Sequence, residues 1–289
     1  MNPLVSIILP NYNHASFLQE RLDSIFNQTY SNIEVIILDD CSTDNSLELL
    51  EAYKNHPRVS HFIVNSKNTG SPFKQWQKGF NLAKGDFIWI AESDDKAELN
   101  FIEKQLEAIQ LYSSDVVVAK TLNFNEKGVF DEVNHPVFRN NQNEILNLQE
   151  VLYCPILNVS AVIFKSHLCK FAKTFTGYNI IGDRVFYHEA FLNYSITKND
   201  STISYFRKSG DSVSTLSNRS KTYYKNYFLE HLKFIKHVKQ TSDLSNELYN
   251  TYVTRFFNRA RYRMSRKEKL NTNYLKMYIT YKLNLKRSK

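Results

Sequence analysis

The sequence of 289 residues has few cysteines, few glycines and no apolar run that approaches the length of a membrane span. Its three cysteines, Cys41, Cys154 and Cys169, are scattered without metal-site spacing, which predicts free thiols in a reducing cytoplasm. The N-terminal segment lacks a basic start and a small-residue cleavage site, so we expect no signal peptide. Nor is there a Gly-rich phosphate loop of dinucleotide or Walker type. The apolar content is ordinary and fits one large domain, alone or with an appendage.

Positive charge is concentrated at the C-terminal end of the chain. Residues 255–289 carry 12 Lys and Arg against one acid, Glu268, a net charge of +11 within a total of +8. The remaining residues therefore carry a net charge of −3. A near-neutral body with a basic tail suits contact with an anionic membrane surface or with nucleic acid.

Strands and helices alternate through the first hundred residues. Continuous apolar runs, typical of buried strands, occupy residues 4–9, 34–38, 59–64 and 87–91. The segments between them show helical spacing of apolar residues. This alternation predicts an α/β fold with a mostly parallel, Rossmann-like sheet covered by helices on both faces. Right-handed crossovers bring the carboxyl ends of such strands to one edge, where ligands bind.

Polar residues follow all four predicted strands. They are residues 10–13, 39–40, 65–70 and 92–95. Glu92, Asp94 and Asp95 place three carboxylates within four residues, and a cation with oxygen ligands would relieve their repulsion. The alternative is a helix N-cap with acidic first-turn residues, because residue 98 begins a helical pattern. Without a Gly-rich loop, the pattern favours handling of an anion by Mg²⁺ or Mn²⁺ at this edge.

The second half of the chain is less regular. Residues 115–119, 158–164 and 202–206 are predicted strands, residues 98–112 and 185–192 are predicted helices, and residues 123–147 are predicted to be an irregular surface excursion. From residue 220 onward we expect helices over 224–238, 244–264 and 267–285. These patterns predict a domain over 1–215 and a basic helical extension over 216–289.

Four segments, in order along the chain, resemble family 2 glycosyltransferases with the GT-A fold. They are the strand Val5–Leu9 with Pro10-Asn11-Tyr12-Asn13, the stretch from Glu34 to Ser46, the turn Asn68-Thr69-Gly70, and the stretch from Ala83 to Asp95. Each segment alone is weakly specific, but the four in this order and spacing are highly specific. The likeness is close over the first hundred residues, looser over 150–215, and absent from the tail.

The resemblance implies an inverting transfer of a sugar from a nucleotide sugar, UDP- or dTDP-linked, to a hydroxyl of a glycan or lipid-linked acceptor. It also implies a role in cell-surface polysaccharide assembly, of the lipopolysaccharide or capsule type, and a divalent metal held by Asp94 and Asp95. By the same resemblance Pro10 and Tyr12 line the nucleotide pocket and Asp39 contacts the base. The nucleotide-sugar-binding residues that it implies are Pro10, Asn11, Tyr12, Asn13, Asp39, Asp40, Asn68, Gly70, Lys74, Glu92 and Asp94.

The chain departs from the family pattern at three positions. Glu92 replaces the usual first Asp of the Asp-x-Asp motif. Its side chain is one methylene longer, although it can still accept a hydrogen bond from a ribose hydroxyl. Lys74 stands where relatives often place an Arg. Ser209 replaces a His that can help to bind metal or diphosphate, with His167 and His188 as possible substitutes.

Glycosyl transfer needs a carboxylate that accepts the proton of the acceptor hydroxyl. Asp183 is the candidate, because it opens a helix after a glycine, where the family keeps an acid. Glu189 is the reserve candidate. The alternative readings are a helix N-cap for Asp183 and a solvated helix position for Glu189.

Two other function classes remain open. A nucleotidyltransferase would share the sheet and the metal carboxylates, but it would normally bring a Gly-rich basic loop where this chain has Pro10-Asn11-Tyr12-Asn13. A nucleotide-sugar-binding scaffold without activity would fit Glu92 and Ser209.

The basic tail also has two readings. It either packs on the catalytic domain or attaches a cytoplasmic enzyme peripherally to the inner face of the plasma membrane. Phe256, Phe257, Ala260 and Met264 lie at spacings that share a helix face, beside a stripe of Arg side chains. Nucleic-acid binding by the tail is the weaker alternative.

Overall fold

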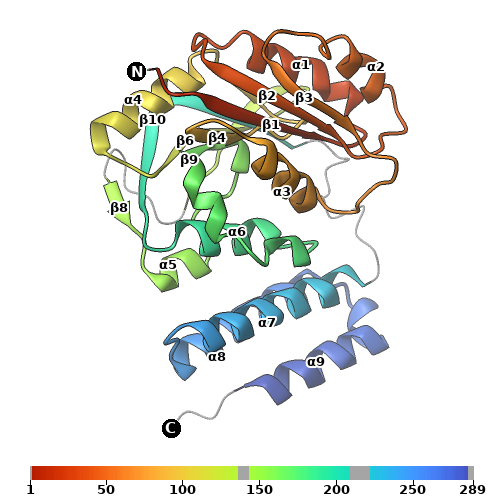
Figure 1. Ribbon diagram of the computed structural model, residues 1–289. Coiled ribbons are helices and arrows are strands. Elements are labelled where there is room, and N and C mark those ends of the chain that lie inside the picture. Colours follow the sequence, from red (N-terminus) through yellow and green to blue (C-terminus); the bar gives the residue numbers. More distant parts are fainter. Residues whose placement is uncertain (1, 136–142, 209–221, 286–289) are drawn as a thin grey trace. The chain divides into compact units, whose positions relative to one another are not determined.

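A computed structural model describes residues 2–135, 143–208 and 222–285 of the chain (Figure 1). These residues form two compact units, which divide between Ser209 and Gly210. The predicted domain boundary after residue 215 lies outside the described residues and stays a prediction.

The first unit is built on a ten-stranded sheet with the strand order β3-β2-β1-β4-β9-β6-β10-β5 and with β7 and β8 attached to β6 and β10. Strands β1 (Val5–Asn11), β2 (Ile33–Asp39), β3 (Val59–Val64) and β4 (Phe87–Ile90) are mutually parallel, as are β6 (Val116–Asn125) and β10 (Ser195–Arg207). The short strands β5 (Lys96–Ala97), β7 (Gly128–Glu132), β8 (Asn143–Ile145) and β9 (Val162–Lys165) pair antiparallel. The predicted α/β fold class is confirmed.

Helices cover both faces of this sheet (Figure 1). On one face lie α1 (Ala15–Phe26), α2 (Ser46–Glu51) and α4 (Phe101–Tyr112), and on the other lie α3 (Pro72–Leu82) and α6 (Gly182–Phe191). A short helix, α5 (Leu148–Leu152), precedes α6 and contacts it. Every residue of β1 and β2 is buried, which agrees with their continuous apolar runs.

The prediction of irregular structure over residues 123–147 was wrong for β7, for β8 and for the end of β6. Most side chains of β7 are exposed, and Glu132 pairs with Lys120 on β6 and with Lys198 on β10. A hairpin held by backbone pairing and surface charges lacks the apolar alternation that marks a strand in sequence. β7 does lie at the surface, as expected.

Glu34 fixes the chain where it enters β4. Its Oε1 accepts hydrogen bonds from the Ser6 hydroxyl (2.5 Å) and from the Lys84 N–H (2.7 Å), while the Gly85 N–H donates to the Ser6 hydroxyl (2.8 Å). A Cβ on Gly85 would lie 2.7 Å from the Leu4 carbonyl oxygen, so only glycine fits this approach. Burial raises the pKa of Glu34, but these hydrogen bonds outweigh it and hold the pKa below its ordinary value.

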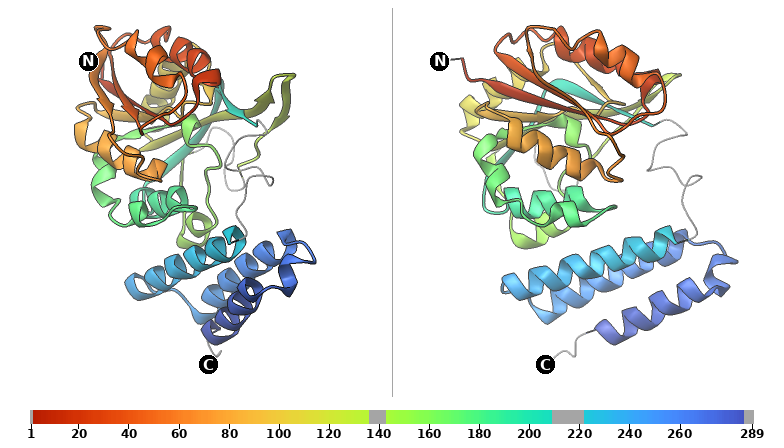
Figure 2. Two further views of the ribbon diagram at one scale, coloured as in Figure 1. Left: turned by 90° about the vertical axis from the view of Figure 1, so that its right-hand side faces the viewer. Right: turned by 45° about the vertical axis from the view of Figure 1, so that its right-hand side comes forward.

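The second unit is a bundle of three helices, α7 (Tyr223–Thr241), α8 (Asn246–Arg263) and α9 (Thr272–Asn284), which pack side by side (Figure 2). The His231 ring stacks on Phe256 with centroids 3.6 Å apart, and Phe257 stacks on Tyr281 at 4.1 Å. The three predicted helices are confirmed, and the predicted apolar face of α8 lies inside the bundle. In the described part of the chain no helix combines the length and the apolar character that a membrane span requires.

We expect Glu34→Gln to lower the free energy of unfolding by about 1–3 kcal/mol at neutral pH, the usual range for losing a hydrogen-bonded buried charge. Because the folded-state pKa of Glu34 is depressed, its contribution is present above the unfolded pKa of about 4.3 and is lost as the pH falls through the folded value. Urea denaturation over this range should show the difference from wild type shrinking with acidity. Glu51→Gln, at an exposed position of α2, is the control with no such trend. A pH-independent difference would contradict this role.

Candidate active site

The carboxyl ends of β1 and β2 meet at one edge of the sheet, as predicted. Asn11 pairs with Asp39 across the two strands, and its Nδ2 donates to Asp39 Oδ2 at 2.8 Å. Asp39 also accepts hydrogen bonds from the Ser42 N–H (2.9 Å) and hydroxyl (2.6 Å). The carboxylate is thus held in one orientation, with part of its acceptor capacity left for a ligand.

Asp40 has a different set of contacts. Its oxygens accept hydrogen bonds from Asn65 Nδ2, from the N–H and hydroxyl of Thr69, and from Gln75 Nε2. These bonds join the end of β2 to the turn at residues 68–70 and to α3. They favour a positioning role for Asp40, and its predicted nucleotide contact stays untested.

The remaining predicted nucleotide-site residues lie at the end of β1, on the loops that flank this edge and in the first turn of α3. Pro10 is buried in β1, and the Tyr12 side chain is 43% exposed. Asn13 adopts φ 54° and accepts the Thr43 N–H at 2.7 Å, which ties the first loop to the second. Asn68 accepts the N–H of Gly70, whose φ is 71°. Lys74 is exposed and donates to the Thr69 carbonyl at 3.0 Å, so it closes the same turn.

Glu92 turns toward α3. The Trp76 indole N–H donates to Glu92 Oε1 at 2.7 Å, and Trp76 itself packs on Phe186 of α6. Burial, together with the charges of Asp94 and Asp95, raises the pKa of Glu92 to about 8 despite this bond and the nearby Arg21. Glu92 is therefore held by protein contacts on the α3 side, whereas its predicted ribose contact is untested.

Asp94 and Asp95 differ in how they are bound. Asp95 is 1% exposed, and its Oδ1 accepts the backbone N–H of Arg207 at 2.9 Å. Burial and the charge of Asp94 raise the pKa of Asp95 to about 7. Asp94 is half-buried, and within residues 2–135, 143–208 and 222–285 its carboxylate accepts no hydrogen bond. Asp94 is thus the carboxylate of this loop that is open to a ligand.

Two buried arginines, Arg21 and Arg207, hold the acidic loop from its backbone, and we call them the arginine clamp. Arg21 Nε donates to the Glu92 carbonyl, and Arg207 Nε donates to the Asp94 carbonyl, both at 2.7 Å. The exposed fractions of Arg21 and Arg207 are 0% and 4%. Burial lowers the pKa of Arg21 to about 10, although the loop carboxylates favour its charged form, so it remains cationic at neutral pH.

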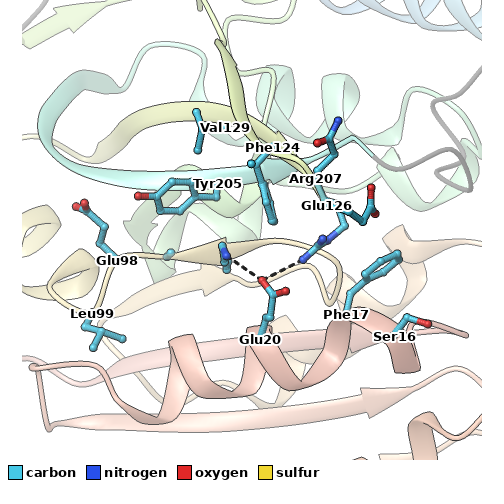
Figure 3. A pocket seen from close by; sticks show the side chains of 14 residues that line it. Ser16, Phe17, Glu20, Glu98, Leu99, Phe124, Glu126, Val129, Tyr205 and Arg207 are labelled. Atoms are coloured by element: carbon cyan, nitrogen blue, oxygen red, sulfur yellow. Dashed lines mark hydrogen bonds and ion pairs between the residues drawn. The ribbon is translucent and has the colours of Figure 1, made fainter.

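Arg207 is itself fixed by its surroundings (Figure 3). Its guanidinium lies 4.5 Å from the ring centroid of Phe17 and 4.3 Å from that of Phe124, and it pairs with Glu20 at 3.2 Å. It borders a cleft of about 1050 Å³ that none of the predicted site residues lines. The cleft is lined by α1, residues 96–99, the β6–β7 hairpin and β10.

The sequence reasoning missed three residues around this loop: Arg21, Arg207 as a clamp residue, and His14. His14 Nδ1 lies 2.8 Å from the Ser93 hydroxyl, between the acidic residues. Arg21 did carry a signal, because it sits among Leu18, Leu22 and Ile25 on the buried face of α1, where an unpaired charge is costly.

The acidic loop fits a divalent cation that takes most of its ligands from a substrate. In the parts of the chain that the structure describes, no group of three or more His, Cys, Asp or Glu side chains could hold a metal alone. Mg²⁺ and Mn²⁺ sites often use one or two carboxylates together with phosphate oxygens and water. Asp94, with Asp95 beside it, offers that donor set.

Asp183 lies in the first turn of α6, where its Oδ1 accepts the N–H of Arg184 at 2.7 Å. Burial raises the pKa of Tyr187 well above its ordinary value, and the charges of Asp183 and Glu92 add to this shift. Trp76, which donates to Glu92, packs on Phe186 of the same helix, so α6 lies on the side of the acidic loop toward which Glu92 turns. Glu189 instead accepts the N–H groups of Lys173 and Thr174 and the Thr174 hydroxyl, which favours a structural role.

His167 and His188, the predicted substitutes for the histidine that Ser209 replaces, lie in different parts of the first unit. His167 follows β9, whose C-terminal residue Lys165 pairs with Phe87 at the start of β4, so it lies at the opposite edge from the acidic loop. The prediction for His167 is therefore wrong. His188 is buried within α6, and Ser209 lies outside the described residues.

The arginine clamp predicts that Arg207→Lys weakens Mn²⁺ binding in the presence of UDP by about tenfold, because the charge remains but the Nε bond to the Asp94 carbonyl is lost. Calorimetric titration with Mn²⁺ would measure this. Arg58→Lys is the control, because it also removes a guanidinium bond to a backbone carbonyl, that of Phe26, away from the acidic loop. Equal metal affinity in wild type and Arg207→Lys would remove the clamp from metal binding.

Comparisons with known proteins show the fold and the family of the chain. GlyG from Streptococcus pneumoniae serotype 4 (strain ATCC BAA-334 / TIGR4) is 38% identical over 129 residues, which are 44% of this chain and 42% of GlyG. The chain thus spans less than half the length of this relative. The crystal structure of S. aureus TarS 1-349 with UDP is similar with a TM-score of 0.70 and 21% identity, over 96% of this chain and 78% of that chain.

A mannosyltransferase, PcManGT from Pyrobaculum calidifontis in complex with GDP-Man and Mn²⁺, has a TM-score of 0.57 and 14% identity, over 99% of this chain and 82% of that chain. At these identities the two structures show the fold, and they confirm the predicted GT-A-like architecture. Glycosyl transferase family 2 matches residues 6–187, which is more than half of the sequence. The chain therefore belongs to glycosyl transferase family 2.

Proposed function

We propose that this protein is an inverting glycosyltransferase that moves a sugar from a UDP- or dTDP-linked donor to a hydroxyl of a glycan or lipid-linked acceptor in cell-surface polysaccharide assembly. The observation that carries the proposal is the open Asp94 carboxylate, held by the arginine clamp at the ligand edge of the sheet. Family membership, the UDP complex of TarS and the name of GlyG support it.

The donor occupies the loops at the ends of β1 and β2 in this proposal. Asp39, fixed by Asn11 and Ser42, accepts a hydrogen bond from the nucleobase, and the exposed Tyr12 ring borders the nucleotide. Asp94 and Asp95 would hold Mn²⁺ or Mg²⁺ against the diphosphate, and a bound cation offsets the negative charge of the leaving group. Asp40 and the turn at residues 68–70 keep the loops in place.

Asp183 serves as the base in this mechanism. It accepts the proton of the acceptor hydroxyl as the oxygen attacks the anomeric carbon from the side opposite the diphosphate. The bond from that carbon to the diphosphate oxygen breaks, the nucleoside diphosphate leaves, and the configuration is inverted. The buried aromatic rings of Phe186, Tyr187 and Trp76 exclude water from this side and so limit donor hydrolysis.

The two predicted domains divide the work in the proposal. The domain predicted over residues 1–215 binds and transfers the sugar, and the basic extension predicted over 216–289 attaches a cytoplasmic enzyme peripherally to the inner face of the plasma membrane, next to a lipid-linked acceptor. The concentration of Lys and Arg after residue 255 supports the attachment.

Thermal denaturation with a panel of nucleotide sugars and Mn²⁺ tests the donor assignment. A matched donor at a hundred times its dissociation constant should stabilise the protein by about 2.7 kcal/mol. Asp94→Ala should abolish the metal-dependent part of this shift without lowering the melting temperature of the free protein, because the Asp94 carboxylate makes no hydrogen bond to the described residues. If Asp94→Ala responds to Mn²⁺ and donor as wild type does, the metal assignment is wrong.

Turnover of the matched donor in Asp183→Asn tests the base. The variant should bind the donor normally and lose transfer by about a hundredfold or more, since it removes a proton acceptor and little volume. Glu189→Gln should keep transfer in the fraction that folds. Loss of transfer in Glu189→Gln alone would move the base to Glu189, and donor binding without turnover in wild type would favour the scaffold alternative.

A further inference from the structure

Helix α9 buries only one side in the three-helix unit. Met277 is fully buried, and Tyr281 stacks on Phe257 with the ring planes 7° apart. These contacts turn the side that carries Met277 and Tyr281 toward α7 and α8.

The opposite side of α9 is apolar and exposed. Leu275, Ile279 and Leu283 follow one another at intervals of four residues, and their exposed fractions are 56%, 47% and 79%. Tyr278, 40% exposed, lies beside them. We call these four side chains the outer stripe. A contiguous apolar stripe in water marks a surface that contacts something else.

The charged residues of α9 and of the segment before it are mainly basic. Helix α9 contains Lys276 and Lys282, both exposed, and no acidic residue. The segment before it carries exposed Arg261, Arg263 and Arg266. The single acid there, Glu268, is engaged by the Ser265 N–H. A basic apolar stripe complements an anionic lipid surface, and it is a poor match for a second copy of itself.

The basic helix singled out in the sequence is not the apolar contact. Phe256, Phe257 and Ala260 of α8, and Met264 directly after it, are at most 5% exposed, because they form the interior of the bundle. The exposed residues of α8 include Arg255 and Arg259, which can meet lipid phosphates but cannot insert.

We propose that α9 is an interfacial helix that lies flat on an anionic bilayer, with the outer stripe among the acyl chains and its lysines at the phosphates. The helix has 13 residues, a length of about 20 Å, which suits lying in the interface rather than crossing it. The inference deepens the proposed membrane attachment, but its test needs no catalytic activity.

The test is co-sedimentation of the full chain with vesicles of phosphatidylcholine and phosphatidylglycerol, and with vesicles of phosphatidylcholine alone, at low and high salt. Wild type should bind the anionic vesicles at low salt and release at high salt. The combined variant Leu275→Ser, Ile279→Ser and Leu283→Ser should lose about tenfold or more in partitioning. The control, Leu111→Ser, Val129→Ser and Phe130→Ser, removes three exposed apolar side chains from the first unit and should bind as wild type does.

Thermal denaturation and the sedimentation velocity of both variants complete the test. A stripe that faces lipid leaves the melting temperature of the free protein unchanged when its residues become serine. A marked fall in the melting temperature of the α9 variant relative to wild type would mean that other residues of the chain cover the outer stripe. If the α9 variant sediments as a smaller oligomer than wild type, a second copy of the chain covers it. Either of these two results would overturn the proposal. So would unchanged vesicle binding by the α9 variant, equal binding of wild type to neutral and anionic vesicles, or no binding of wild type to vesicles. Donor turnover without vesicles reports separately on the proposed function.

Discussion

The clustering of three carboxylates after β4 is the constraint on which the arrangement around the active site depends. Glu92, Asp94 and Asp95 repel one another, and burial makes the repulsion stronger. Two buried guanidinium groups oppose this charge, Arg21 from α1 and Arg207 from β10. Each bonds a backbone carbonyl of the loop rather than a carboxylate. The clamp therefore fixes the loop without occupying Asp94.

Acids of the same type serve different purposes because their contacts differ. Asp40 is saturated by hydrogen bonds and fastens β2 to α3, whereas its neighbour Asp39 keeps acceptor capacity. Glu92 is bonded by an indole, and Asp94 accepts nothing from the described residues. A site whose supporting residues are bonded and whose contact residues stay open is organised before a ligand binds, so less ordering is needed on binding.

Much of the fold could be predicted from the sequence, because parallel strands buried on both faces consist of continuous apolar residues. The runs in β1, β2 and β4 end within two residues of the carboxyl ends of the observed strands, and the polar residues after them gather at one edge. The strands β7 and β8 could not be found in this way, since most of their side chains are exposed and their apolar residues, Val129, Phe130 and Ile145, form no buried run.

The positions of the candidate site residues followed from motif order, but their roles did not. Whether Glu189 is a base or a structural acid depends on where the N–H groups of Lys173 and Thr174 point, which no local pattern encodes. No local pattern encodes the role of Arg207 either, because it holds the acidic loop through contacts with a carbonyl and an aromatic ring of residues more than eighty positions away.

In the three-helix unit, the spacing of apolar residues predicts which residues share a helix face but not what that face contacts. Apolar spacing correctly grouped Phe256, Phe257 and Ala260 on one side of α8, with Met264 directly after the helix, but it could not say what that side contacts. In a three-helix bundle each helix needs a buried side, and the most apolar side of a helix packs inside the bundle. The helix with the weaker pattern, α9, buries Met277 and leaves its leucines outside. A surface that contacts lipid is therefore to be sought in the apolar residues that remain after packing, rather than in the most amphipathic segment of the sequence.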